Sequence, residues 1–251
     1  MSRSDITRDA LFATPLDELA SFSFDEQVAR VFPDMIKRSI PGYSQILGMA
    51  GVIAKRYVPE GGRVYDLGAS LGATTLSVAQ QLDHLEDVDF IALDNSTAMT
   101  ERCAVLLKKN LPHRTITVLC DDVRSFNYQP CDLILLNFTL QFLPPSDRQV
   151  LLARLYRALR PGGALIISEK IHFQDPRKAQ LLYELHHDFK RANGYSDMEI
   201  SQKRTALEDV MLTDTPEQHQ QRLSKTGFSF VSQWFQYLNF ASFLAIKGDS
   251  Q

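Results

Sequence analysis

The sequence predicts an α/β fold: a doubly wound, mostly parallel seven-stranded sheet with a helical insertion before the last hairpin. Short aliphatic runs bounded by Gly, Asp, Asn or Ser alternate five times with amphipathic stretches. Nearly continuous apolar strands are typical of a sheet covered on both faces, and strand–helix alternation indicates parallel βαβ units. The five expected strands are residues 64–67, 90–93, 116–119, 133–136 and 164–167.

The stretches between these runs carry helix signals. One helix is expected at Thr74–Leu82, after a glycine loop, and another at Ser96–Lys109, which begins with a capping serine and ends on two lysines. A third, Ser146–Leu159, should stop before the break Pro161-Gly162-Gly163. Upstream, apolar residues from Tyr43 to Tyr57 fall at helical spacing, which predicts a helix packed before the first strand.

The last third of the chain departs from this alternation. Phe228–Tyr237 and Phe243–Ile246 are aromatic-rich and joined by a short connection, which predicts a closing hairpin. The residues between the fifth strand and this hairpin, 170–227, are mostly helical by pattern and too many for a plain loop. We therefore expect a single domain over residues 1–251, with 170–227 as a helical insertion within it.

Composition argues against several classes of function. The 251 residues include 27 Lys and Arg against 30 Asp and Glu, a net charge of −3, which disfavours a protein built mainly to grip nucleic acid. The three cysteines show neither a C-x-x-C pair nor zinc spacing, so we expect a reducing compartment and no structural metal. The longest apolar run, Ile46–Ala54, is too short for a bilayer, and Met1–Ile6 lacks a signal core. The expected location is the cytoplasm.

The loop after the first strand is the first candidate binding element. Gly68-Ala69-Ser70-Leu71-Gly72 follows a strand that ends in Asp66 and leads into a helix, so backbone N–H groups can approach a ligand. The same letters match the nucleophile elbow of hydrolases, with His172 and His219 as candidate bases. That elbow usually lies on a strand deep in the chain rather than on the first, so the hydrolase interpretation is the weaker one.

Polar side chains follow the next three strands. Asp94, 28 positions after Asp66, can accept two hydrogen bonds from a ribose diol or cap the next helix, and we favour the ribose. One aspartate of Asp121-Asp122 can accept from an exocyclic amine such as adenine N6, or be a turn acid. Asn137 stands where a substrate headgroup would lie, in an aromatic loop that core packing would also explain. Because ligands bind at this edge of an open α/β sheet, the shared position makes the set specific.

Two levels of family resemblance follow from these motifs. Asp66–Gly72, Asp94, Asp122 and Pro161-Gly162-Gly163 resemble a class I S-adenosylmethionine-dependent methyltransferase, although the usual loop has glycine where Ser70 stands. From about Leu11 to Lys247 the chain is similar to the carboxy-S-adenosyl-L-methionine synthase family, and the part after the fifth strand is the most specific. The matching segments are Phe32–Ile36, Ser39–Tyr43, Leu136–Phe142, His187–Ser196 and Glu199–Arg204.

The resemblance implies an unusual transferase reaction. Family members take S-adenosyl-L-methionine and prephenate, release phenylpyruvate, and place the departing carboxyl group on the sulfonium methyl carbon. The product, carboxy-S-adenosyl-L-methionine, is a candidate to co-purify; it supplies a tRNA carboxymethyltransferase that builds the oxyacetic acid modification of wobble uridine. The resemblance also implies a homodimer without a metal, with the insertion 170–227 as substrate cover and dimer contact. Direct nucleic-acid binding by this chain should be weak.

The resemblance also assigns site residues. Arg204 would bind the new carboxylate as the catalytic, selectivity-determining residue, from its own subunit or from the neighbour's. Arginine suits this role because its fork binds both carboxylate oxygens, whereas the plain alternative is a solvated helix arginine. The residues implied to bind the nucleoside and amino acid parts are Tyr43, Gly68, Ala69, Ser70, Asp94, Asn95, Asp122, Val123 and Asn137.

Other interpretations stay open. No histidine or glutamate stands out as the proton acceptor for the methyl group, so we expect the substrate's own hydroxyl or carboxylate to serve. His186-His187 invites a metal interpretation, but adjacent histidines point to different helix faces, and we expect surface or dimer-contact roles for both. A conventional methyltransferase acting on a small molecule or RNA, and a non-catalytic carrier of the modified nucleoside, are the alternatives that the fold alone cannot exclude.

Overall fold

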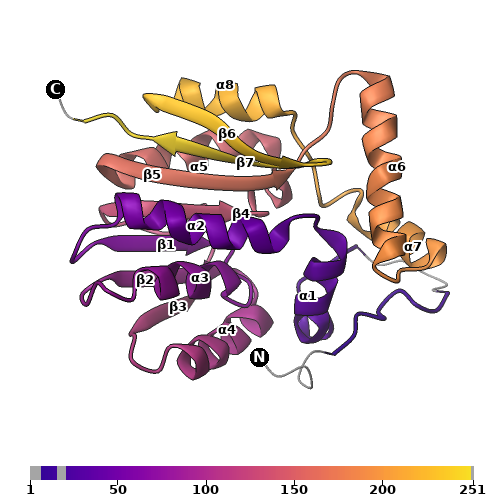
Figure 1. Cartoon of the computed structure of the whole chain (residues 1–251), viewed down its shortest axis with the longest axis horizontal. Coiled ribbons are helices and arrows are strands. Elements are labelled where there is room, and N and C mark those ends of the chain that lie inside the picture. Colours follow the sequence, from indigo (N-terminus) through magenta and orange to yellow (C-terminus); the bar gives the residue numbers. More distant parts are fainter. Residues whose placement is uncertain (1–6, 16–20, 250–251) are drawn as a thin grey trace.

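A seven-stranded sheet with strand order β3-β2-β1-β4-β5-β7-β6 forms the centre of the computed structural model (Figure 1). The structure describes residues 7–15 and 21–249, so the hexapeptide Met1–Ile6 lies outside the described residues. Strands β1 to β5 run parallel and β7 pairs antiparallel with both β5 and β6, which confirms the predicted fold class. The strands are β1 (Arg63–Leu67), β2 (Asp89–Asp94), β3 (Ile116–Cys120), β4 (Cys131–Asn137), β5 (Leu159–Lys170), β6 (Phe230–Tyr237) and β7 (Phe240–Ile246).

Helices cover both faces of this sheet because alternate strand residues point to opposite faces. Tyr65 and Ile134 pack in one core with α5 (Pro145–Ala158) and α8 (Pro216–Thr226). Their neighbours along the strands, Val64 and Leu133 among them, pack in a second core on the other face. The helices of that second face are α2 (Tyr43–Tyr57), α3 (Ala73–Gln81) and α4 (Thr97–Asn110).

Local sequence explains where these helices begin and end. Ser96 caps α4 by accepting the Met99 N–H at 3.2 Å, and Lys108 and Lys109 occupy its last turn, as predicted. Within the described residues, no helix is both long and apolar enough to cross a membrane. The predicted helices before the first strand and after the glycine loop are confirmed as α2 and α3.

One detail of the predicted alternation is wrong. No helix joins β3 to β4: residues 121–130 are irregular, and the rings of Phe126 and Tyr128 pack against Tyr65 where a helix was expected. The helix before Pro161-Gly162-Gly163 ends as predicted: α5 stops at Ala158, and β5 begins directly afterwards at Leu159, earlier than the expected start at residue 164. The β4–β5 pairing shifts register there, which lets the strand accommodate the glycines.

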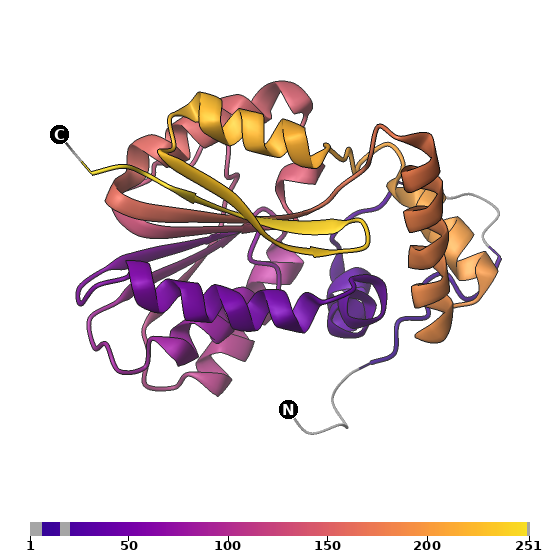
Figure 2. The same cartoon turned by 45° about the horizontal axis from the view of Figure 1, so that its top comes forward.

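The insertion separates into two parts. Helix α8 packs against α5 and β6, so it belongs to the ordinary helical layer of the sheet. The other two helices, α6 (Pro176–Ala192) and α7 (Asp197–Leu207), stand together beyond one end of the sheet, on the side of α1 (Glu26–Ser39), as Figure 2 shows. A capping box of Ser196 and Glu199 starts α7. Helix α1, which contains Pro33, was not predicted as a helix.

Candidate active site at the carboxyl edge of the sheet

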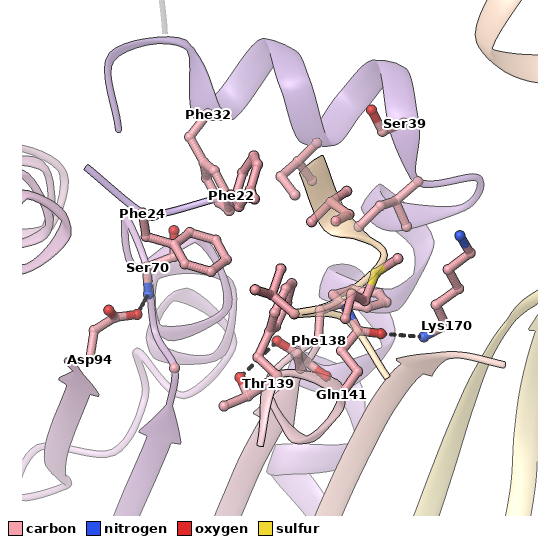
Figure 3. Close-up of a pocket in the computed structure, with 18 of the residues that line it drawn as sticks. Phe22, Phe24, Phe32, Ser39, Ser70, Asp94, Phe138, Thr139, Gln141 and Lys170 are labelled. Atoms are coloured by element: carbon pink, nitrogen blue, oxygen red, sulfur yellow. Dashed lines mark hydrogen bonds between the residues drawn. The ribbon is translucent and has the colours of Figure 1, made fainter. Parts of the chain in front are cut away.

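A cavity of about 530 Å³ lies at the carboxyl edge of the sheet, within the usual size range of small-molecule sites. The ends of β1 to β5 form one side, and α1, α6, α7 and the segment before α1 form the other; Figure 3 shows part of this wall. All the residues that the resemblance assigns to the nucleoside and amino acid parts line it: Tyr43, Gly68, Ala69, Ser70, Asp94, Asn95, Asp122, Val123 and Asn137.

The loop after β1 turns sharply at the cavity wall. Gly68 has a φ of 71°, and a Cβ added there would lie 2.1 Å from Thr139 Oγ1, so only glycine fits. Ser70 also has a left-handed φ, 51°, although it is not a glycine. Its N–H donates to Asp94 Oδ2 at 2.8 Å (Figure 3), which holds the strained turn against the next strand.

The hydrolase interpretation of this loop finds no support in the geometry. Ser70 Oγ donates to Met99 Sδ at 3.4 Å rather than to a histidine. His172 Nδ1 lies 3.1 Å from Thr213 Oγ1, and His219 stacks on a β7 ring. The serine therefore lacks the base that an activated nucleophile needs.

Asp94, at the end of β2, keeps acceptor capacity for a ligand. Its Oδ2 accepts the Ser70 N–H and its Oδ1 accepts the Ser96 N–H at 2.9 Å, which leaves about two of its four lone-pair directions free. Burial raises its pKa, against the lowering effect of these N–H donors. The helix cap is Ser96 rather than Asp94, so the capping alternative does not account for this carboxylate.

The acid before it on β1 has a different task. Asp66 accepts both the N–H and the hydroxyl of Thr75, at 2.9 and 2.6 Å, and so ties the first turn of α3 to the strand. Burial raises the pKa of Asp66 to about 6. This carboxylate is therefore structural.

Asp122 and Val123 follow β3 and present a carboxylate beside an apolar side chain. Asp122 is paired with Arg124 at 2.6 Å, which lowers its pKa, and Arg124 reaches on to Asp147 at 3.1 Å. Val123 is buried, and its carbonyl accepts the Tyr128 hydroxyl at 2.6 Å. Both Asp122 oxygens already accept N–H groups of Arg124, so a purine amine would share this carboxylate with Arg124 while its ring contacts Val123.

Asn137, at the end of β4, carries an unused acceptor. Its Nδ2 donates to Thr74 Oγ1 at 3.2 Å, whereas its buried Oδ1 has no hydrogen-bond partner in the described part of the chain. A buried acceptor without a partner costs free energy that a bound donor, such as an ammonium group, would recover. This is the observation that best marks the headgroup position.

The loop after Asn137 is held by an acid that the sequence did not single out. The Glu169 carboxylate, buried at the end of β5, accepts the N–H groups of Thr139, Leu140 and Gln141 at 3.1, 2.8 and 3.1 Å. The next residue, Lys170, donates its backbone N–H to Gln141 Oε1 at 2.9 Å (Figure 3). The ends of β4 and β5 are therefore locked together at the cavity.

Aromatic side chains form the far wall, and sequence reasoning missed most of them. Phe24 packs edge-on against Phe22 and Phe142, each with ring centroids 5.2 Å apart, and lies near Phe32 (Figure 3). The Phe22 N–H donates to the Ala206 carbonyl at 2.9 Å, which ties this segment to α7. No periodicity marks so short a segment, so only its aromatic content could have pointed to it.

Lysines from three elements face the same cavity and were also missed. Lys170 ends β5, Lys190 lies on α6 and Lys203 on α7. Burial is the main cause that lowers the pKa of Lys190 to about 7 and those of Lys170 and Lys203 to about 8. The position of Lys170 at the carboxyl end of a parallel strand was a signal for it, the same one that identified Asp94 and Asn137.

The surface position expected for His186 is wrong, and Arg204 lies outside the cavity of its own chain. His186 is not on the surface: it is buried beside the cavity and its Nε2 lies 2.9 Å from the Ser39 carbonyl. Burial keeps its pKa far below the usual value, so it is a neutral donor. Arg204 is exposed, does not line the cavity of its own chain, and donates to the Tyr183 hydroxyl at 2.7 Å.

Comparison with known proteins is consistent with this site. Residues 64–163 match a family model described as methyltransferase domain. A protein of Chromohalobacter salexigens named carboxy-S-adenosyl-L-methionine synthase is 55% identical over 96% of this chain and 88% of its own length. One of the same name from Cronobacter sakazakii is 51% identical over 97% of this chain and 98% of its own length.

Solved structures share the fold at much lower identity. An O-methyltransferase family protein of Burkholderia thailandensis has a TM-score of 0.65 at 12% identity, over 94% of this chain and 66% of its own. Magnesium protoporphyrin IX methyltransferase of Synechocystis has a TM-score of 0.56 at 14% identity, over 82% of this chain and 80% of its own. These similarities support the architecture alone.

Proposed function

The chain belongs to the carboxy-S-adenosyl-L-methionine synthase family, and we propose that its cavity joins S-adenosyl-L-methionine to a carboxyl group taken from prephenate. It is a transferase that forms carboxy-S-adenosyl-L-methionine. The observation that carries the assignment is the 51–55% identity to synthases over nearly the whole chain, because the fold alone supports many chemistries.

The strand ends suit the adenosyl substrate in the order of the sheet. Asp122 beside Val123 would accept the adenine amine, and Asp94 would accept the two ribose hydroxyls with its free lone pairs. The unpartnered Asn137 Oδ1 would accept the ammonium group of the methionine part. The glycine loop, residues 68–72, lies between these positions and allows close approach of the sulfur.

The reaction balances without a further co-reactant. Prephenate loses its ring carboxyl group and its ring hydroxyl to become phenylpyruvate, and the carboxyl carbon forms a bond to the sulfonium methyl carbon. The proton that the methyl group gives up leaves with the hydroxyl as water. In this scheme the substrate's own hydroxyl accepts the proton, so the reaction requires no side chain as the base.

The aromatic wall has a role in this chemistry. A carbanion next to sulfur must meet the carboxyl group before water protonates it, so water has to be excluded. Phe22, Phe24 and Phe142 supply an apolar wall from segments far apart in the sequence. Helices α6 and α7, which line the other side of the cavity, would be the substrate cover in this proposal.

The synthase is distinguished from a conventional methyltransferase by its donor. The protein is incubated with S-adenosyl-L-methionine and prephenate labelled with ¹³C in its ring carboxyl group, and the adenosyl product is weighed. We expect a product heavier by one carbon dioxide that carries the label, formed over many turnovers. Methyl transfer to another acceptor without any need for prephenate would contradict the proposal, and a single turnover would indicate a carrier.

Arg204 lies outside the cavity of its own chain, so a role at the site requires the cavity of another subunit. A homodimer would bring Arg204 of one subunit to the cavity of the other. Leu181 and Leu185 on α6 and Met198 on α7 are exposed apolar side chains on the same two helices, which supports a subunit contact there. In the proposed dimer, Arg204 of one subunit binds the new carboxylate in the other.

Mixing two inactive variants tests this arrangement. Arg204→Ala and Asp94→Ala proteins are unfolded together and refolded, so that mixed dimers form. If Arg204 acts across subunits, one site of each mixed dimer has both residues intact, and activity returns. If it acts within its own subunit, every site carries a lesion and the mixture stays inactive.

The remaining parts of the proposal concern the cellular setting. The net charge of −3 supports weak direct binding to tRNA, so the product would pass to the tRNA carboxymethyltransferase as a free small molecule in the cytoplasm. Carboxy-S-adenosyl-L-methionine would remain bound during purification, without a metal. The mass of the small molecule released on denaturation tests whether the product remains bound. A strongly salt-dependent complex with tRNA would contradict the weak binding to tRNA.

A further inference from the structure

Three lysine side chains from different elements meet at one end of the cavity. Lys170 ends β5, and Figure 3 shows its side chain rising from the strand on the side of Ser39. Lys190 of α6 and Lys203 of α7 approach from the cover. All three residues line the same cavity, and repulsion from Lys170 and Lys203 adds to burial in lowering the pKa of Lys190.

Two of these ammonium groups lack a counter-ion in the described part of the chain. Lys203 Nζ lies 3.6 Å from an Asp9 carboxylate oxygen and 3.2 Å from Ser39 Oγ. Neither Lys170 Nζ nor Lys190 Nζ has a hydrogen bond or ion pair among the described residues, and the nearby His186 is neutral. The cavity therefore presents two amine groups without a counter-ion, and each carries an uncompensated positive charge when it is protonated.

Keeping like charges together in a half-enclosed site costs free energy, which an anionic ligand would recover. The arrangement matches a ligand with two carboxylates, one for each uncompensated ammonium group. A monocarboxylate or the zwitterionic methionine part would leave one charge without a partner.

The sheet order places these charges next to the methionine part. Asp94 ends β2 and Asn137 ends β4, whereas Lys170 ends β5, the next strand along the edge. At about 4.8 Å between strands, Lys170 lies roughly one strand spacing beyond Asn137 and three beyond Asp94. The lysine end therefore remains available when an adenosyl ligand occupies the ends of β1 to β4.

We propose that Lys170 and Lys190, with Lys203 behind them, form the subsite that binds the carboxyl donor through its two carboxylates. This deepens the proposed function, because prephenate is such a dicarboxylate, and it gives the donor a binding site within one subunit. Arg204 would then be needed for the carboxylate that has been transferred, and the lysines for the carboxylates that arrive.

The test is a titration of prephenate into protein saturated with S-adenosylhomocysteine, which has no methyl group to react. Lys170→Met and Lys190→Met keep the aliphatic stem but remove the charge. We expect each to weaken prephenate binding at least tenfold and to leave S-adenosylhomocysteine binding within twofold of wild type, which also verifies folding. Lys178→Met, an exposed lysine on the same helix α6, is the matched control and should change neither affinity.

The outcomes separate this subsite from the identity of the donor. If prephenate does not bind wild type but another cyclic dicarboxylate, such as chorismate, binds and depends on Lys170 and Lys190, the subsite stands and the proposed donor is wrong. If no dicarboxylate binds, or if binding is unchanged in both variants, the subsite is wrong. Phenylpyruvate, with one carboxylate, should bind at least tenfold more weakly than prephenate.

Proton uptake provides a second readout that a merely structural role would not produce. Lys190 is faced by Lys170 from β5 and by Lys203 from α7, and the charge of Lys203 is partly compensated by Asp9. The pKa of Lys190 lies near 7. A bound dianion would raise that pKa, so at pH 8 binding should take up on the order of one proton. Calorimetry in two buffers of different ionisation enthalpy measures it, and Lys190→Met should take up fewer protons than wild type, the remainder being due to Lys170 and Lys203, whose pKa values lie near 8. Uptake equal to wild type would contradict the role of Lys190.

Discussion

The two halves of the cavity differ in chemistry and in construction. The strand-end half consists of acceptors, such as Asp94 and Asn137, fixed by short loops and backbone N–H donors. The cover half consists of lysines and aromatic rings contributed by α6, α7 and the segment before α1. Acceptors suit hydroxyl and ammonium groups, and cations suit carboxylates. Under the proposed function, the strand-end half binds the adenosyl ligand and the lysines opposite it bind the carboxyl donor, so the two halves divide the two substrates between them.

The largest expected effect is a loss of stability caused by a substitution in the strand-end half. Gly68→Ala adds a Cβ that would lie 2.1 Å from Thr139 Oγ1 at a φ of +71°. We expect it to lower the free energy of unfolding by about 3 kcal/mol or more, measured by denaturant titration. Gly61→Ala is the matched control, because its φ of +66° is similar but nothing lies within 4 Å. That control should cost about 1 kcal/mol, and equal losses would show that the clash is not real.

The next effect concerns ligand binding in the same half. Asp94→Ala removes the acceptor proposed for both ribose hydroxyls and releases the Ser70 N–H. We expect about 100-fold weaker binding of S-adenosylhomocysteine, close to 3 kcal/mol, by calorimetry. Asp121→Ala, an exposed acid one strand away, should bind normally. Unchanged affinity in Asp94→Ala would remove this residue from the site.

A smaller effect is expected on the affinity for the carboxylated ligand, when the arginine proposed to bind its carboxylate is removed. Arg204→Ala should weaken carboxy-S-adenosyl-L-methionine about tenfold, since a charge-assisted hydrogen bond contributes about 1.5 kcal/mol. Binding of S-adenosyl-L-methionine should not change. Arg191→Ala, an exposed arginine of α6 paired with acids, is the control. Equal losses for the two ligands would contradict the assignment.

The smallest expected effect is a pH dependence of the free energy of unfolding that comes from a lysine of the cover half. The pKa of Lys190 is near 7 in the folded chain and near 10.4 when unfolded, so the unfolded chain binds more protons between these values. Stability should therefore rise with pH from 7 to 9, by on the order of 1 kcal/mol from this group. The slope should be smaller in Lys190→Met than in wild type or Lys178→Met. Identical slopes would mean that Lys190 is fully solvated.

The sequence predicted the two halves unequally for physical reasons. Strand ends can be predicted because the alternation of strands and helices fixes which residues stand at the carboxyl edge of the sheet. Asp94, Asp122 and Asn137 all line the cavity as expected. The cover depends on long-range packing: the Phe22 N–H, for example, donates to a carbonyl of α7, far away in the sequence. Lys203 and Arg204 are neighbours in one motif, and only the helical rotation decides which faces the cavity.

The most direct measurement compares two ligands on two variants. S-adenosylhomocysteine and prephenate are each titrated into Asp94→Ala and Lys190→Met. The account predicts that Asp94→Ala loses affinity for S-adenosylhomocysteine while prephenate binding is kept, and that Lys190→Met does the reverse. If each variant lost both ligands equally, or neither, the cavity would not consist of two separate recognition halves.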